Sequence, residues 1–297
     1  MAVEGSVVLQ PVQIAPNVYF VRGESGPSSK ANQGFMSNAG FVVTREGVVV
    51  FDALGTSVLG LQLIQAIANI TSQPIRRVIV SHYHADHFYG LQSFQDAGVE
   101  IWAHRGGKRY LASDVAQQRL SQRRQELSPW VDGNTRLAPA DRWLEGDTSF
   151  NLGEFHFDLI HSGPAHSPED LMLSIRGQGI LFVGDLLFAG RIPFVGDADS
   201  KQWLVALDKM LALRPRIVIP GHGQVSTDPD RDLTLTREYL AFLRSEMARA
   251  IANFESFESA YERIDWSRFK GYPAFEQANR GNAYNTFILM EQEALNR

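Results

Sequence analysis

Residues 81–87 read SHYHADH, so three of the chain's 8 histidines and an aspartate fall in one short stretch. The preceding residues, RRVIV, are rich in β-branched side chains and are typical of a buried strand. A loop that places several imidazoles and a carboxylate directly after a strand supplies several ligands to one metal ion. The chain must therefore fold so that the end of this strand opens onto a site instead of packed core.

Three further metal-binding side chains follow apolar, strand-like segments in the second half of the chain. His166 comes after FHFDLIHSG, Asp185 after ILFVG and His222 after RIVIPG. We expect each of them in a short loop just past its strand. If the strands lie side by side, their ends share one edge of the fold and these side chains meet the first cluster there.

The ligand types predict which ions the site takes. The chain has no cysteine, which excludes disulfides, thiolate ligands and cysteine nucleophiles. Imidazole and carboxylate ligands suit zinc, and they also accommodate iron or manganese. A catalytic zinc ion takes about three protein ligands and leaves one position for water. The set therefore predicts two ions that share a nucleophilic hydroxide. Its members are His82, His84, Asp86, His87, His166, Asp185 and His222.

Strand-like and helix-like segments alternate along most of the chain. Strand patterns occur at residues 18–23, 40–53, 76–82, 99–104, 155–163, 170–185 and 216–223. Helical patterns occur at residues 57–70, 88–95, 105–127 and 200–213. Two such sets predict an α/β fold, a β-sandwich with helices on both outer faces. The glycine-rich and serine-rich segment 23–34 is expected to be a mobile, functional loop.

The last part of the chain has a different pattern. From Asp228 onward it is mostly helical, and Asp228 followed by Pro229 is typical of a helix start. We therefore expect a catalytic domain over residues 1–227 and a helical extension over residues 228–297 packed on it. The sequence leaves open whether the extension caps the sandwich, shapes the substrate entrance or forms a dimer surface. A monomer and a homodimer are both compatible with it.

Charge and hydropathy narrow the choice of partners. The chain has 33 acidic and 28 basic side chains, for a net charge of −5. This balance argues against a nucleic-acid partner, because nucleic-acid-binding domains are usually basic. No run of apolar residues is long enough to span a bilayer. We therefore expect a small-molecule substrate and no membrane association.

Taken together, these motifs resemble those of the metallo-β-lactamase superfamily over roughly residues 18–225. HYHADH matches the H-x-H-x-D-H signature, and His166, VGDLLF and IPGHG match the later motifs in order. The resemblance implies a four-layered αββα sandwich. It also implies that His82, His84 and His166 bind a first metal, while Asp86, His87 and His222 bind a second. Asp185 would bridge the two ions, and Asp52, in VVFDAL, would support a ligand histidine from behind.

The resemblance also implies an activity. The bridging aspartate is similar to that of glyoxalase II, a thioester hydrolase, although the cysteine-containing glycine turn of that enzyme is missing here. The segment GDLLFAGRIPFVGDADSKQW is similar to hydrolases associated with bacterial sulfur oxidation and quinoprotein systems. These relatives imply a zinc hydrolase of thioesters or related esters in which Asp86 orients the hydroxide. They also imply a periplasmic location, although no signal peptide is visible, and a cytoplasmic one otherwise.

Two other activities remain open. One is hydrolysis of β-lactams or lactones. The other is an iron-dependent persulfide dioxygenase, which shares the first motif but uses one iron. Candidate substrate-pocket residues are aromatic, apolar or basic side chains near the motifs. They are Phe35, Met36, Tyr83, Phe88, Arg191 and Phe194.

Overall fold

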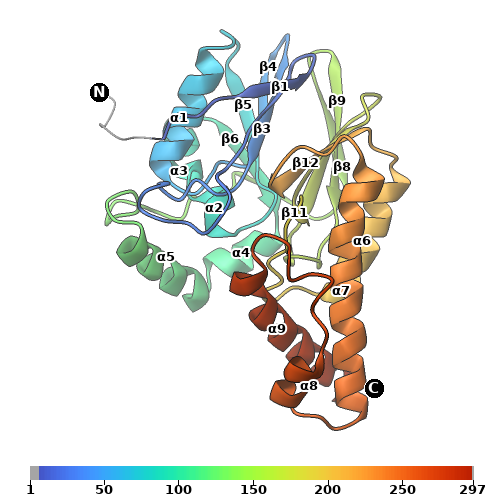
Figure 1. Cartoon of the computed structure of the whole chain (residues 1–297). Coiled ribbons are helices and arrows are strands. Elements are labelled where there is room, and N and C mark those ends of the chain that lie inside the picture. The colour runs from blue at the N-terminus through green and yellow to red at the C-terminus, as the bar shows by residue number, and fades with distance from the viewer. Residues whose placement is uncertain (1–6, 296–297) are drawn as a thin grey trace.

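The computed structural model describes residues 7–295, and it contains two β-sheets stacked face to face (Figure 1). The first sheet has seven strands in chain order, β1-β2-β3-β4-β5-β6-β7. The β3–β4 pair is a hairpin, whereas β4, β5, β6 and β7 run parallel to one another. The strands are β1 (Val12–Ala15), β2 (Val18–Val21), β3 (Ala39–Thr44), β4 (Gly47–Phe51), β5 (Ile75–Ile79), β6 (Glu100–His104) and β7 (Arg142–Leu144).

The second sheet has five strands in the order β12-β11-β10-β9-β8. Its strands pair antiparallel except β11 and β12, which are parallel. The parallel pair brings the carboxyl ends of two distant segments to the same edge of the sheet. The strands are β8 (Thr148–Leu152), β9 (Phe155–His161), β10 (Leu171–Ile175), β11 (Ile180–Phe188) and β12 (Ile217–His222).

Helices cover both outer faces and complete four layers (Figure 1). The first sheet is covered by α1 (Ser57–Ala68), α2 (Ala85–Phe88) and α3 (Leu91–Asp96). Nearby lie α4 (Gly106–Leu111) and α5 (Asp114–Glu126). The second sheet is covered by α6 (Ser200–Ala212) and α7 (Pro229–Ala252), and α8 (Phe257–Arg263) and α9 (Phe275–Leu295) pack against α7. The predicted αββα sandwich with a helical C-terminal extension is confirmed.

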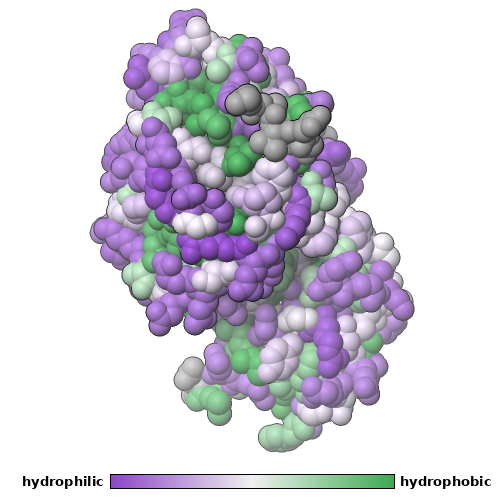
Figure 2. All heavy atoms as spheres, turned by 90° about the vertical axis from the view of Figure 1, so that its left-hand side faces the viewer, coloured by the Kyte–Doolittle hydropathy of each residue, from purple (hydrophilic) through white to green (hydrophobic). Residues whose placement is uncertain are grey.

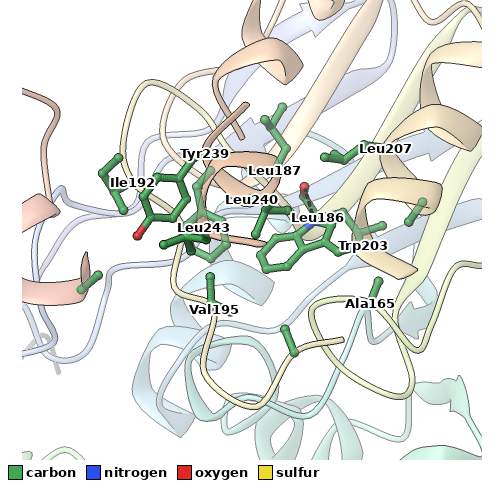
Figure 3. Packing of buried hydrophobic residues seen from close by; sticks show 14 of the residues in the cluster. Ala165, Leu186, Leu187, Ile192, Val195, Trp203, Leu207, Tyr239, Leu240 and Leu243 are labelled. Atoms are coloured by element: carbon green, nitrogen blue, oxygen red, sulfur yellow. Dashed lines mark hydrogen bonds between the residues drawn. The ribbon is translucent and has the colours of Figure 1, made fainter. Parts of the chain in front are cut away.

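Three hydrophobic clusters separate the four layers. One lies between the sheets and contains Phe51 and Phe182. The second lies under α1 and α3, and the third lies between the second sheet and α6, α7 and α9. Figure 3 shows part of the third cluster, in which Trp203 of α6 packs beside Leu240 of α7. The extension therefore shares a continuous core with the sandwich, while the exact domain boundary at residue 227 stays a prediction.

Some elements differ from the predictions. The helix expected over 105–127 is two helices, because Ser113 interrupts it and caps α5 by accepting a hydrogen bond from the Ala116 amide. Strands β1, β7 and β8 were not predicted, since they are short and most of their residues are exposed or only partly buried. Asp185 lies inside β11 and not in a loop after it. Apolar residues continue on both sides of Asp185, so the strand runs past it.

The extension forms a smaller lobe beside the sandwich (Figure 2). Asp228 caps α7 through a side-chain bond from the Arg231 amide, with Pro229 in the first turn, as predicted. Among the described residues, no helix has the length and apolar character needed to cross a membrane. The first residues, where a signal peptide would lie, are mostly outside the described part of the chain.

Candidate metal centre

The first group of ligand candidates lies at the carboxyl end of β5. The chain leaves the strand at Ile79, and the next residues turn directly into the short helix α2. His84 lies at the N-cap of this helix, and Asp86 and His87 lie within it. A strand followed so closely by a helical turn projects alternate side chains toward the same edge of the sandwich.

The second group comes from the parallel pair β11 and β12. Asp185 lies in β11 at a register irregularity next to Gly184, whose φ of 53° favours glycine. His222 ends β12, and Gly221 precedes it. A Cβ at Gly221 would lie 2.0 Å from Asp185 Oδ1. The glycines of VGD and PGHG therefore allow two strand ends to approach closely around one carboxylate.

Four donor side chains form a first set at this edge: His82, His84, His166 and Asp185. His166 Nε2 lies 2.9 Å from His84 Nδ1 and 3.4 Å from Asp185 Oδ2. His82 Nε2 lies 3.8 Å from the same Asp185 oxygen. A tetrahedral zinc site with bonds of about 2.0–2.1 Å has ligand atoms roughly 3.3 Å apart, and the spacing here brackets that value.

A second set lies beside the first: Asp86, His87 and His222. His222 Nε2 lies 3.3 Å from Asp86 Oδ2, and His87 Nε2 lies 3.6 Å from that atom. Both imidazoles also approach Asp185 Oδ1, at 3.0 Å for His87 and 3.3 Å for His222. Asp185 thus presents Oδ2 to the first set and Oδ1 to the second, which is the arrangement expected of a bridging ligand.

Several donor atoms at this centre are buried and lack a hydrogen-bond partner. They are His82 Nε2, His87 Nε2 and Asp185 Oδ1. Buried polar atoms normally find partners, because an unsatisfied one costs about 1–3 kcal/mol. These unpaired atoms of the described residues gather around Asp185, one imidazole from each set, and fit bound cations. The residues present are therefore suited to hold metal.

Comparison with known proteins agrees with this geometry. The family model described as the metallo-beta-lactamase superfamily matches residues 32–222, from before Phe35 to the last candidate ligand. This chain belongs to the metallo-beta-lactamase superfamily. Proteins of this superfamily bind metals, and the relatives named below include hydrolases of small molecules, so the chain is a metallo-hydrolase of that group.

Several individual proteins are similar to this chain. The probable metallo-hydrolase YqgX of Bacillus subtilis is 25% identical over 212 residues, covering 70% of this chain and 92% of its own. The acyl-coenzyme A thioesterase MBLAC2 of Gallus gallus is 28% identical over 158 residues, covering 48% and 55%. The solved sec-alkylsulfatase Pisa1 of Pseudomonas sp. superposes with a TM-score of 0.71 at 16% identity, covering 86% of this chain and 45% of that one.

The two donor sets differ in the protonation of their imidazoles. Burial lowers the pKa of the first-set imidazoles His82 and His84, and it lowers that of His166 to about 3. Burial alone would lower the pKa of His222 as well. The Asp185 and Asp86 carboxylates outweigh this effect and raise the pKa to about 9. The Asp185, Asp86 and Asp52 carboxylates likewise outweigh burial at His87 and raise its pKa. Without metal, the imidazoles of the first set are therefore neutral, while those of the second set are protonated at neutral pH.

Asp52 lies behind both donor sets. Its Oδ2 is 2.8 Å from His87 Nδ1 and accepts a bond of 2.8 Å from Ser81 Oγ. Ser81 Oγ in turn lies 2.9 Å from His82 Nδ1, so one carboxylate orients a ligand of each set. Asp52 adopts a φ of 64°, a left-handed conformation that is unfavourable for a non-glycine residue. Because His87 and His82 use Nδ1 for these contacts, the Nε2 atom of each ring is left to bind metal.

Residues 36–38 support the centre from the first half of the chain, a role that the motifs did not indicate. The Met36 carbonyl is 2.8 Å from His222 Nδ1, which fixes that ring. Ser37 donates its hydroxyl proton to the Asp86 carbonyl. Asn38 Nδ2 donates to the carbonyls of Pro220 and Gly223, on either side of His222. These contacts are long-range, and no local sequence signal predicts them.

The candidate pocket residues separate into two groups. Tyr83, Phe88 and Phe35 are 1%, 0% and 5% exposed and belong to the hydrophobic cluster under α1 and α3. Their assignment to the pocket is therefore corrected: all three side chains pack in the core, away from solvent. Phe194 is 52% exposed, and Arg191 and Met36 are half-buried. These three candidates remain available to a substrate.

The Asp52 network leads to a testable prediction. We expect Asp52→Asn to weaken metal binding by about 10–100-fold, because the amide cannot accept all the bonds that the carboxylate accepts. Ser81→Ala should weaken it by about 10-fold, since His82 loses its link to Asp52 while His87 keeps its direct contact with that carboxylate. Zinc affinity is measured by competition with a chromogenic chelator. Ser226→Ala is the matched control, because Ser226 is also buried but its Oγ has no partner. Equal affinities in the wild type and both network variants would contradict this role.

Proposed function

We propose that the protein is a hydrolase that uses two zinc ions to cleave thioesters or related carboxylic esters. The observation that supports this most directly is the placement of Asp185, whose two oxygens face different donor sets. When bound, the two zinc ions would lower the pKa of a bound water. Their positive charge would also polarise the substrate carbonyl. A site with one iron, as in the dioxygenase alternative, would not need a carboxylate placed in this way.

Asp86 has a separate role in this proposal. It is half-buried, whereas the neighbouring ligand candidates His87 and His222 are fully buried. Burial alone would raise the pKa of Asp86. His87 and His222 outweigh this effect and hold the pKa below its usual range. The carboxylate is therefore ionised, and we propose that it orients the attacking water by accepting a hydrogen bond from it.

The choice of thioesters follows from leaving-group chemistry. A thiol has a pKa of about 8.5, so a thiolate departs without a proton donor, whereas an amide nitrogen requires one. The acyl-coenzyme A thioesterase among the relatives is consistent with this substrate class. The similarity of the GD motif to glyoxalase II points in the same direction, without the features that recognise glutathione. We therefore propose a glyoxalase II-like hydrolase with a different substrate.

Hydrolysis of a substrate panel tests this proposal. The panel contains an aryl thioester, the matching oxygen ester, an acyl lactone and the chromogenic β-lactam nitrocefin, with metal content measured on the same sample. We expect two zinc equivalents, the highest kcat/KM for the thioester, and complete loss of activity on chelation with recovery on zinc addition. Activity that survives complete metal removal would contradict the proposal. One equivalent of iron with oxygen uptake on a persulfide would support the dioxygenase instead.

A further inference from the structure

The loop that follows β11 brings a cationic side chain close to the metal centre. Arg191 Cζ lies 5.9 Å from the centroid of the Phe188 ring. Phe188 is itself stacked on the candidate ligand His222, with ring centroids 4.9 Å apart and an interplanar angle of 5°. Burial lowers the pKa of Arg191, while the charges of Asp185 and Asp86 act in the opposite direction. The guanidinium therefore lies within electrostatic reach of both carboxylates of the centre.

This guanidinium has donors that the described residues do not use. Its Nε is buried without a hydrogen-bond partner. Asp185 and Asp86 form ion pairs with His87 and His222, and no ion pair joins either of them to Arg191 within the described chain. A buried cationic donor without an acceptor is costly, so such a group is retained where a ligand supplies the acceptor. A planar guanidinium is suited to two oxygens of a carboxylate, sulfate or phosphate.

The C-terminal extension holds this loop in place. Asn282 of α9 donates from Nδ2 to the Pro193 carbonyl at 2.7 Å and accepts from the Val195 amide at 2.9 Å. Tyr239 Oη bonds to the same Asn282 amide at 3.0 Å. Figure 3 shows Ile192 and Val195 packed beside Tyr239 and Leu243 of α7. The Ile192 amide also donates to the Pro273 carbonyl at 3.0 Å.

We propose that Arg191 binds an oxyanion group of the substrate beside the metal centre, and that Asn282 positions Arg191 through the loop. The inference rests on the proposed function, because it assigns a substrate class to the same site: small thioesters or esters that carry a carboxylate, sulfate or phosphate. Arg119, exposed on α5, adds positive charge near His84. The helical extension is thus part of the substrate-binding apparatus, one of the three roles that the sequence left open.

A pair of substrates tests this inference. The aryl monothioester of glutaric acid carries a free carboxylate, and the thioester of glutaramic acid replaces it with a neutral amide of the same size. The readout is the charge preference, the ratio of kcat/KM for the acid to kcat/KM for the amide. We expect a preference of about tenfold or more in the wild type. Arg191→Gln should reduce it about 10–100-fold, because a hydrogen-bonded charge pair is lost.

Further variants separate charge, geometry and position. Arg191→Lys keeps the charge without the planar fork and should give an intermediate preference. Asn282→Ala should reduce the preference by raising KM for the acid more than for the amide. Arg237→Gln is the control, since Arg237 is an exposed arginine of α7 that pairs with Asp208. It should leave the preference unchanged. A preference that is absent in the wild type, or equal in Arg191→Gln, would overturn the inference.

A binding readout keeps this inference independent of turnover. Inorganic sulfate should raise the melting temperature of the zinc-loaded wild type and of Arg237→Gln, but not that of Arg191→Gln. An equal shift in all three proteins would count against Arg191. If neither thioester is hydrolysed, the proposed function fails while the sulfate measurement still tests the anion site. If both are hydrolysed at equal rates in a zinc-dependent reaction, the result supports the hydrolase proposal and contradicts the anion site.

Discussion

Replacement of Asp185 by asparagine should lower kcat/KM for the preferred thioester by about 10³-fold or more and leave fewer than two zinc ions bound. Asp185 Oδ1 lies 3.0 Å from His87 Nε2, and Oδ2 lies 3.4 Å from His166 Nε2, so the residue belongs to both donor sets. An amide keeps the shape but loses the negative charge, and its nitrogen cannot bind a cation. Both halves of the centre are therefore affected by one isosteric change.

Metal content and steady-state kinetics on the same preparation check this prediction. Asp197→Asn is the matched control, because Asp197 is an exposed aspartate in the loop that follows β11. It should keep two zinc ions and wild-type activity. The melting temperature of the metal-free proteins shows whether Asp185→Asn remains folded. A folded Asp185→Asn variant with two zinc ions and activity within threefold of the wild type would refute the bridging role.

The two halves of the centre should fill with metal in a pH-dependent order. The first set is expected to bind zinc with little pH dependence between about pH 5 and 8, because its imidazoles are already neutral. His166, with a pKa lowered to about 3, is the clearest example. The second set includes His222, with a pKa raised to about 9. His87 also has a raised pKa, so the metal displaces protons from both imidazoles. The zinc affinity of this set should therefore rise by about tenfold or more per pH unit through this range.

The same pKa values determine how the stability of the metal-free protein changes with pH. The pKa of His222 is higher in the folded state than its ordinary value of about 6.5. Its contribution to stability is therefore fully present below about pH 6.5 and is lost as the pH rises through about 9. His166 has a lowered folded pKa, so the protein loses stability as the pH falls from about 6.5 toward 3. The metal-free protein should be most stable near pH 6.5–7.

Calorimetric zinc titrations at pH 6, 7 and 8 distinguish the two steps. Repeating each titration in two buffers of different ionisation enthalpy counts the protons released in each step. We expect protons to be released mainly in the step that fills the second set, and His222→Gln should reduce the pH dependence of that step, because His87 still releases its proton. Equal pH slopes for both steps would show that the two donor sets do not differ in protonation.

Much of the architecture could be predicted from local pattern. The helix expected at residues 57–70 and the helix capped by Asp228 depend on neighbouring residues, so the sequence indicated them correctly. The short strand β8 was missed, because its residues are exposed or only partly buried and only Phe150 and Leu152 are strongly apolar. Tyr83 and Phe88 were assigned to the pocket from their proximity in sequence to the ligands. Proximity along the chain does not determine which way a side chain points.

The sequence by itself determined the chemistry: which imidazoles and carboxylates are present, and that each lies in or near the end of an apolar strand segment. Tertiary structure decided the rest. It placed His166 beside His84, split the oxygens of Asp185 between two donor sets, and put Asn38 and Asn282 where they support loops distant in sequence. The physical reason is that local pattern encodes the period of strands and helices. Contacts across the stacked sheets depend on how the layers pack, and no single segment of the chain contains that information.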